Sequence, residues 1–168
     1  MKRLLALAPI ALVSMSAHAG HGMFSLQYSA LSYTDEWSGQ ELNPDAAVVR
    51  AGHLPTEHVG IEGRLGIGLR DETVGAAEVG LSHLLGVYGQ ARAPFDPVTP
   101  YFVAGLTRAQ AEFSDPGGSM TEADSGFSFG VGVDIVPDDL GLNLEYMQYL
   151  DETGYEFEAF SAGLVVIW

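Results

Sequence analysis

Ser82 and His83 are the residues of this chain that come nearest to a hydrolytic pair. A hydroxyl nucleophile beside an imidazole base is the first requirement of acyl transfer. The two residues fall in the run EVGLSHLLGVYGQA, which alternates like a β-strand, and adjacent strand residues point to opposite faces. No recognisable motif surrounds them. The pattern favours a histidine at an interface or a β-bulge, and we predict no catalytic residue and no enzyme activity.

Three other histidines raise the question of a metal. His53 and His58 bracket a short turn, and His21 precedes the first predicted strand, so all three could gather at one rim. Spacing without a fixed geometry is weak evidence for zinc. The acidic loops could attract calcium, but none has the spacing of an EF-hand. We predict no metal site and no cofactor, and leave open whether these loops bind divalent cations.

Five charged residues lie inside strand-like runs, where charge is unusual: Glu62, Arg64, Arg108, Asp134 and Glu145. Glu62 and Arg64 belong to VGIEGRLGIGLR, in which one alternating row is nearly apolar and the other holds only glycine and charge. Buried charges are retained when they are partnered and hydrogen-bonded. Because the signs nearly balance, we predict that the five side chains project into one interior and pair there.

The elements that must position these residues are strands. Alternation predicts eight of them, at residues 23–33, 47–51, 59–70, 78–91, 100–113, 127–135, 140–150 and 157–168. No sustained helical period follows residue 20. In the fourth run His83 falls in the apolar row and Leu84 in the polar one, which indicates a bulge or a change of register.

The connections between the predicted strands alternate in length and character. TDEWSGQELNP, DETVGAA, SDPGGSMTEADSG and DETGYE are acidic, whereas PTEH, PFDPVT and VPDDL are mostly shorter and contain proline. Long loops at one end and short turns at the other are the layout of an outer-membrane β-barrel. We therefore predict an all-β fold, an eight-stranded antiparallel up-and-down transmembrane barrel.

A soluble barrel would alternate as well, with its apolar row pointing inward. The glycine-rich rows argue against it, because glycine weakens a strand and suits a crowded interior in which small residues leave room for large polar ones. A soluble periplasmic lipocalin-like barrel that binds a small apolar ligand stays open as the alternative.

The first 19 residues predict export. Lys2 and Arg3 precede an apolar run, and Ala17 and Ala19 flank His18 in a signal-peptidase pattern. Cleavage divides the chain into a signal peptide at 1–19 and a barrel domain at 20–168, with five arginines, no lysine and 22 acidic residues, a formal charge of −17. Nucleic-acid binding through phosphates is excluded. The absence of cysteine excludes disulfides and thiolate chemistry.

The end of the chain carries an unbroken apolar row that closes on an aromatic residue: Phe160, Ala162, Leu164, Val166 and Trp168. Aromatic residues also lie near many predicted strand ends, where they would form the interfacial girdles of a membrane barrel. This prediction covers Tyr28, Tyr33, Trp37, Tyr101, Phe113, Tyr146, Tyr149 and Tyr155.

Four stretches carry a resemblance to a known family: Thr99-Pro100-Tyr101 before AGL, then FGVGVDI, LNLEYMQY and FSAGLVVIW. In their order and spacing they resemble the small eight-stranded outer-membrane barrels of Gram-negative bacteria, the OmpA-like transmembrane domain group. By analogy Glu145 matches the inward glutamate of that group, with Arg108 as its partner. The sequence departs from the group in lacking lysine after the signal, and no downstream peptidoglycan-binding domain is found, so cell-wall anchoring is not implied.

The resemblance implies a monomeric protein of the cell outer membrane with a structural or surface-interaction role and a plugged polar interior rather than a wide diffusion pore. Its expected partners are outer-membrane lipids and lipopolysaccharide, through divalent cations, and the assembly machinery, which would read Phe160, Leu164, Val166 and Trp168 as a signal. Some barrels of this size modify lipid A, so an enzyme of that kind, using Ser82 and His83, is the second alternative.

Overall fold

The computed structural model describes residues 20–35, 40–70, 72–74, 77–115, 118–152 and 155–168. The expected signal peptide at 1–19 lies outside them. Within the described residues, no helix is long and apolar enough to cross a membrane.

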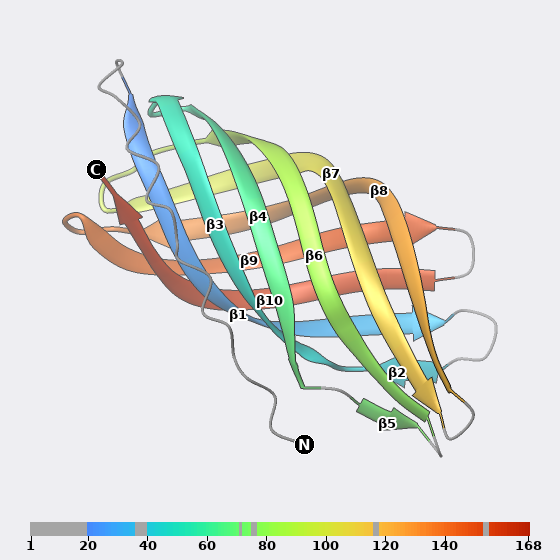
Figure 1. Cartoon of the computed structure of the whole chain (residues 1–168). Helices are drawn as coiled ribbons and strands as arrows, with labels where there is room; N and C mark the ends of the chain where they lie inside the picture. Colours follow the sequence, from blue (N-terminus) through green and yellow to red (C-terminus); the bar gives the residue numbers. More distant parts are fainter. Residues whose placement is uncertain (1–19, 36–39, 71, 75–76, 116–117, 153–154) are drawn as a thin grey trace.

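Eight long strands form one closed antiparallel barrel (Figure 1). Two short strands, β2 (Gln40–Leu42) and β5 (Glu72–Val74), pair with β1 and β6 beside the long hairpins. The ring closes where β10 pairs with β1 from Met23↔Ile167 to Asp35↔Tyr155. The predicted fold class is confirmed. The long strands are β1 (His21–Asp35), β3 (Asp45–Thr56), β4 (Val59–Arg70), β6 (Ala77–Arg92), β7 (Val98–Asp115), β8 (Gly118–Ile135), β9 (Leu140–Glu152) and β10 (Tyr155–Ile167).

Strand β4 shows which face is which. Its side chains alternate between exposed and buried along most of its length. Ile61, Leu65 and Ile67 are 58–59% exposed, whereas Glu62 and Arg64 are at most 3% exposed. An apolar outer wall around a polar interior is the reverse of a soluble barrel. The lipocalin-like alternative is therefore wrong.

Glycine makes room for the large interior side chains. Gly132 lies directly across from Tyr101 in the β7–β8 register. A Cβ atom at Gly132 would clash with the Tyr101 ring, and one at Gly130 would clash with the Tyr146 carbonyl oxygen and the Met147 sulfur. At these two inward positions only glycine leaves space for the neighbouring backbone, ring and thioether.

A β-bulge in β6 confirms the irregularity expected there. The register with β7 shifts between Leu81 and His83. Leu81 and Leu84 both end inside the barrel, at 8% and 1% exposure, and Ser82 between them is exposed. His83 is half-buried and lies opposite the outward Ile67 of β4. Because of the bulge, Ser82 and His83 do not face opposite sides of the wall, contrary to the simple alternation expected from the sequence.

Candidate functional site

The most distinctive site is a network of charged side chains in the middle of the barrel interior. At its centre the Arg64 guanidinium donates two hydrogen bonds to Glu145, from Nη1 to Oε1 at 2.6 Å and from Nη2 to Oε2 at 2.8 Å. Arg64 belongs to β4 and Glu145 to β9, which are four strands apart in either direction around the ring. This ion pair therefore joins diametrically opposite walls across the barrel axis.

Arg50 of β3 and Glu62 of β4 complete a ring of four charges. Arg50 donates from Nε and Nη2 to Glu62 Oε2, at 3.0 and 2.9 Å. Arg64 Nε donates to Glu62 Oε1 at 2.6 Å, and Arg50 Nη1 lies 3.5 Å from Glu145 Oε2. All four side chains are shielded from solvent. Each charge has two partners of opposite sign, which is the condition under which buried ions are retained.

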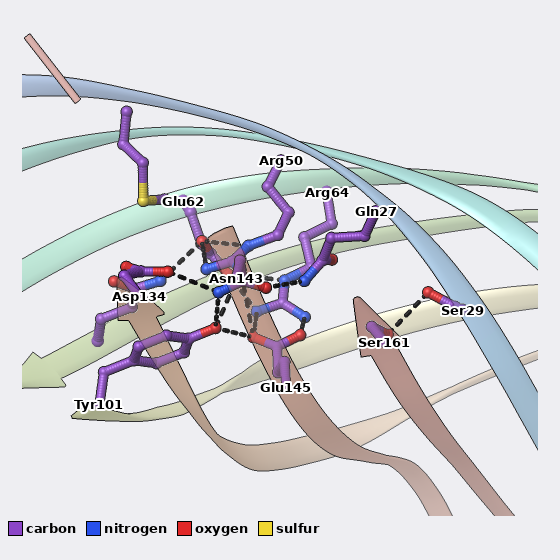
Figure 2. A network of polar contacts seen from close by, with 12 residues as sticks. Gln27, Ser29, Arg50, Glu62, Arg64, Tyr101, Asp134, Asn143, Glu145 and Ser161 are labelled. Atoms are coloured by element: carbon purple, nitrogen blue, oxygen red, sulfur yellow. Dashed lines mark hydrogen bonds and ion pairs between the residues drawn. The ribbon is translucent and has the colours of Figure 1, made fainter. Parts of the chain in front are cut away.

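Tyr101 of β7 contacts two of these four charged side chains, Glu145 and Arg50. Its hydroxyl donates to Glu145 Oε2 at 2.7 Å and accepts from Arg50 Nη1 at 3.0 Å and Asn143 Nδ2 at 2.9 Å. The Arg50 guanidinium also lies 5.3 Å from the centre of the Tyr101 ring, within the range of a cation–π contact. Figure 2 shows the tyrosine beside Glu145, Asn143 and Asp134.

A second ion pair extends the network toward the short-turn end. Arg92 of β6 donates from Nη2 to Asp134 Oδ2 of β8 at 2.7 Å. Asn143 Nδ2 bridges Asp134 to the Tyr101 hydroxyl, with 2.6 Å to Asp134 Oδ1. Gln90 connects the other side, since its Nε2 donates to Glu62 at 2.8 Å and its Oε1 accepts from Arg92 at 2.8 Å. The network as a whole holds three arginines and three carboxylates and is neutral.

The structure brings four of the five predicted interior charges, Glu62, Arg64, Asp134 and Glu145, into this network. Arg108 is the exception, because it is exposed on the outer wall of β7. Its placement inside the barrel, and its pairing with Glu145, are wrong. The inward residues of β7 are Tyr101, Val103, Thr107 and Ala109, all at odd-numbered positions. Because side chains alternate along a strand, Arg108 at an even-numbered position faces outward.

Two arginines of the network, Arg50 and Arg92, were missed. Arg50 lies in a short run of alanine and valine that has no glycine row to mark its inner face. Arg92 follows Tyr88 and Gln90 at alternate positions of β6, and all three are buried. That row of large polar residues was a usable signal, because a lipid-facing row would not hold glutamine and arginine together.

Apolar clusters lie on both sides of the network along the barrel axis. Toward the short turns, Met23, Leu54 and Val165 pack together with Val136 and Ile167. Toward the long hairpins, the cluster includes Leu31, Leu84, Met147, Tyr149 and Phe157. The network thus lies between two clusters of buried apolar side chains.

The chemical alternatives can be placed as well. Ser82 Oγ lies 3.4 Å from His83 Nδ1 on the outer wall, and no carboxylate among the described residues contacts His83 to orient it. His58 lies 3.7 Å from Glu57 in an exposed turn. Among the described residues no group of three metal-ligating side chains forms.

The residues predicted to form an aromatic girdle divide between the two faces of the wall. Tyr28 and Tyr146 lie outside, 51% and 40% exposed, whereas Tyr101 and Tyr149 are interior residues, so their placement in a girdle is wrong. Tyr33, Trp37, Phe113 and Tyr155 have side chains outside the described set. In β10, Phe160 and Leu164 face outward, and the exposed Trp168 follows the strand, with backbone hydrogen bonds to Gly22.

The chain belongs to the outer membrane protein beta-barrel domain family, whose model matches residues 5–167. It is a protein of the outer membrane. No curated protein matches it.

Solved structures share its fold at low identity. The chain resembles Ail, the attachment invasion locus protein of Yersinia pestis, which was solved alone and with the heparin analogue sucrose octasulfate; for the structure of Ail alone the identity is 14%, the TM-score 0.70 and the coverage 90% of this chain and 100% of Ail. Neisserial surface protein A matches at 14% and 0.71, covering 86% and 96%. The N-terminal barrel of Pseudomonas aeruginosa OprF matches at 14% and 0.59, covering 86% and 97%. These likenesses establish the small outer-membrane barrel as the fold.

Proposed function

We propose that this protein is a closed outer-membrane barrel with a structural or surface-interaction role and no diffusion pore. The observation that carries the proposal is the bidentate Arg64–Glu145 pair between opposite walls, since an ion pair on the axis occupies the place where a pore would run. Eight strands enclose a space just wide enough for side chains to fill. The termini and short turns then lie in the periplasm, and the long acidic hairpins lie outside the cell.

The neutrality of the network supports a plug more than a selective channel. A selective pore needs ionisable groups that water and ions can reach, and conduction needs binding that is weak enough to release. Here each carboxylate is held by arginine, by amide donors or by Tyr101, and apolar clusters cover both ends of the axis. Opening the barrel would require breaking several buried charge-assisted hydrogen bonds together.

Conductance across a planar lipid bilayer tests the plug. The purified mature chain, with folding verified by its shifted gel mobility without heating, is expected to give no stable open channel. Arg64→Ala with Glu145→Ala removes the axial pair together and is the variant expected to leak. A matched control, Leu69→Ala with Phe127→Ala, changes two outward side chains and should stay closed. Steady porin-like conductance of the unmodified chain would sink the proposal.

The surface role rests on charge. The four long hairpins and the strand ends beside them are acidic, whereas the sulfated heparin analogue that binds Ail is a polyanion. An acidic surface repels polyanions and attracts cations. We therefore propose that the hairpins engage divalent cations, and through them the phosphates of lipopolysaccharide, rather than a sulfated glycan. Isothermal titration with Ca²⁺ and Mg²⁺ is expected to show weak binding; tight binding of a sulfated oligosaccharide would contradict this part.

A catalytic role is not part of the proposal, because His83 has no acidic partner among the described residues. Mass spectrometry of lipid A from cells that make the protein should show the same acyl chains with the unmodified protein and with His83→Ala. Loss of an acyl chain only with intact His83 would instead establish a lipid A-modifying enzyme.

The row Phe160, Leu164, Val166 and Trp168 is proposed to be the outer-membrane assembly signal. Three of its members are exposed on the outer wall. Deleting Trp168 is expected to lower the amount of protein assembled in the outer membrane, while the purified variant still refolds in detergent. Loss of refolding would mean that Trp168 serves stability rather than delivery.

A further inference from the structure

The outer wall of the barrel carries a hollow, on the opposite side of the wall from the interior charge network. It has a volume of about 610 Å³ and lies over β3, β4, β6 and β7, which run side by side (Figure 1). Its sides are aliphatic, with Leu65, Val87 and Leu106 at 59%, 71% and 67% exposure. Its floor is recessed because the small residues Gly63 and Ala51 lie opposite each other, whereas larger side chains surround them.

Gly63 keeps the hollow open. A Cβ atom built at this position would meet only the Gly86 carbonyl oxygen, at 3.9 Å. No close backbone approach therefore requires glycine there, unlike at Gly132, where an interior ring occupies the space. The absence of a side chain leaves an apolar groove on a surface that faces lipid.

Arg108 lies at the edge of this hollow, opposite Leu85 and Ser125 in the cross-strand register. Three of the five arginines in the barrel domain are buried in the network, and Arg70 lies 3.3 Å from Asp45. Arg108 is exposed and makes no ion pair with any described carboxylate. In so acidic a chain, an outer-wall arginine with no ion-pair partner among the described residues is unusual and points to an anion from outside the protein.

The depth of Arg108 in the wall fits the boundary between hydrocarbon and headgroups. Toward the long hairpins, the outward residues change from Val87 to His83 on β6 and from Leu106 to Gln110 on β7, with Leu85 and Arg108 between. Arg108 is ten residues from Val98 at the start of β7. Ten residues of a tilted strand rise by roughly 25 Å, which is about the height of the apolar band of such barrels.

We propose that this hollow is a lipid site of the outer leaflet: an acyl chain lies over Gly63 and Ala51, and a phosphate of the same glycolipid binds Arg108. Guanidinium is suited to phosphate because its paired N–H donors match two phosphate oxygens. The acyl chain restores the van der Waals contacts that the missing Gly63 side chain leaves unmade. The inference deepens the proposed lipid partnership, since it names a direct site that needs no divalent cation.

Native mass spectrometry of the folded mature chain in detergent tests the site, with three probes: diphosphorylated lipid A, its dephosphorylated form, and inorganic phosphate. One molecule of diphosphorylated lipid A should bind in the presence of a chelator, and the dephosphorylated form should bind about tenfold more weakly, as expected for one lost charge-assisted contact. Inorganic phosphate should not compete at similar concentration. If it competes equally well, Arg108 is a simple anion site and the acyl part of the proposal is wrong.

Paired variants separate the two halves of the site. Arg108→Gln should weaken binding about tenfold, whereas Arg70→Gln, which removes the other exposed arginine, should not. Gly63→Leu fills the hollow and should weaken binding of both lipid forms. Gly89→Leu is its control, because a Cβ atom there meets nothing within 4 Å and Gly89 does not line the hollow. Equal binding by all four variants would overturn the inference. If no lipid binds selectively but the barrel conducts no ions, the lipid site is wrong and the proposed plug still stands.

Discussion

Arg64 and Arg108 place the same side chain in opposite surroundings. Arg64 points into the barrel, where it is fully buried and donates to two carboxylates. Arg108 points out of the barrel at the hairpin side of the apolar wall and has no ion-pair partner among the described residues. The difference teaches that charge in this wall is not tolerated in general. Inside, it is accommodated by pairing; outside, under the proposal above, it is accommodated where the strand leaves the hydrocarbon.

The largest effect is expected from breaking the axial pair on one side. Arg64→Ala leaves Glu145 and Glu62 buried with less than their full compensation, and removal of one partner of a buried pair costs about 3–5 kcal/mol. Guanidinium unfolding in phosphocholine vesicles, followed by tryptophan fluorescence, measures the loss in free energy of unfolding.

The double variant Arg64→Met with Glu145→Leu is the control for this prediction. It removes both charges of the pair and keeps volume, so it should recover much of the loss, because apolar replacement of a whole pair is often close to neutral. A single variant as stable as the original chain would show that water reaches the site and that the interior is not closed.

The next largest effect is expected from a charge placed on the lipid-facing side of the wall. Leu65→Arg places a charge on the lipid-facing row of β4, six residues from the short-turn end of the strand. Arginine near the middle of the bilayer costs about 2–4 kcal/mol in such barrels. Leu69→Arg, on the same row beside Arg70, is the control and should cost about 0–1 kcal/mol because it lies near the interface. Equal losses at the two positions would place the membrane differently along β4.

Tyr101→Phe is expected to have a smaller effect within the network. It removes one donor to Glu145 and one acceptor for Arg50 and Asn143, while the ring remains. A buried hydrogen bond lost to a charged group costs about 1–3 kcal/mol. Tyr146→Phe is a matched control, because its hydroxyl donates to the half-exposed Glu158, which water can serve instead. If the two variants are destabilised equally, burial does not make the Tyr101 hydrogen bonds more important for stability than the exposed one of Tyr146.

For some strands the sequence predicted correctly which alternating row of side chains faces the interior, and for others it did not. The difference has a physical reason. In β4 and β8 one row alternates glycine with charge or serine, and only a crowded interior suits that row. In β7 the inward row holds Val103 and Ala109 beside Tyr101 and Thr107, while the outward row includes Arg108. The inward row of β7 contains apolar residues, and its outward row contains a charged one. The two rows therefore differ too little in polarity to show which of them faces the interior.

The partners of the charges could not be predicted from any single strand. Arg64 reaches Glu145 across the lumen, and Arg92 reaches Asp134 over the intervening strand β7. Which residues share a level depends on the stagger between strands, which accumulates around a closed barrel. Composition gave the near balance of sign, and the register was needed to show which charge meets which.

The smallest effect is expected at Arg108, and it is the most informative for the comparison. In vesicles of phosphocholine alone, Arg108→Gln should change the free energy of unfolding by no more than about 0.5 kcal/mol, as is usual for a surface residue. In vesicles that contain diphosphorylated lipid A, the original chain should gain stability by mass action and the variant should gain less, because a ligand stabilises the state that binds it. A loss above about 1 kcal/mol in phosphocholine would mean that Arg108 is held by the protein itself, and the contrast with Arg64 would then be one of degree rather than of kind.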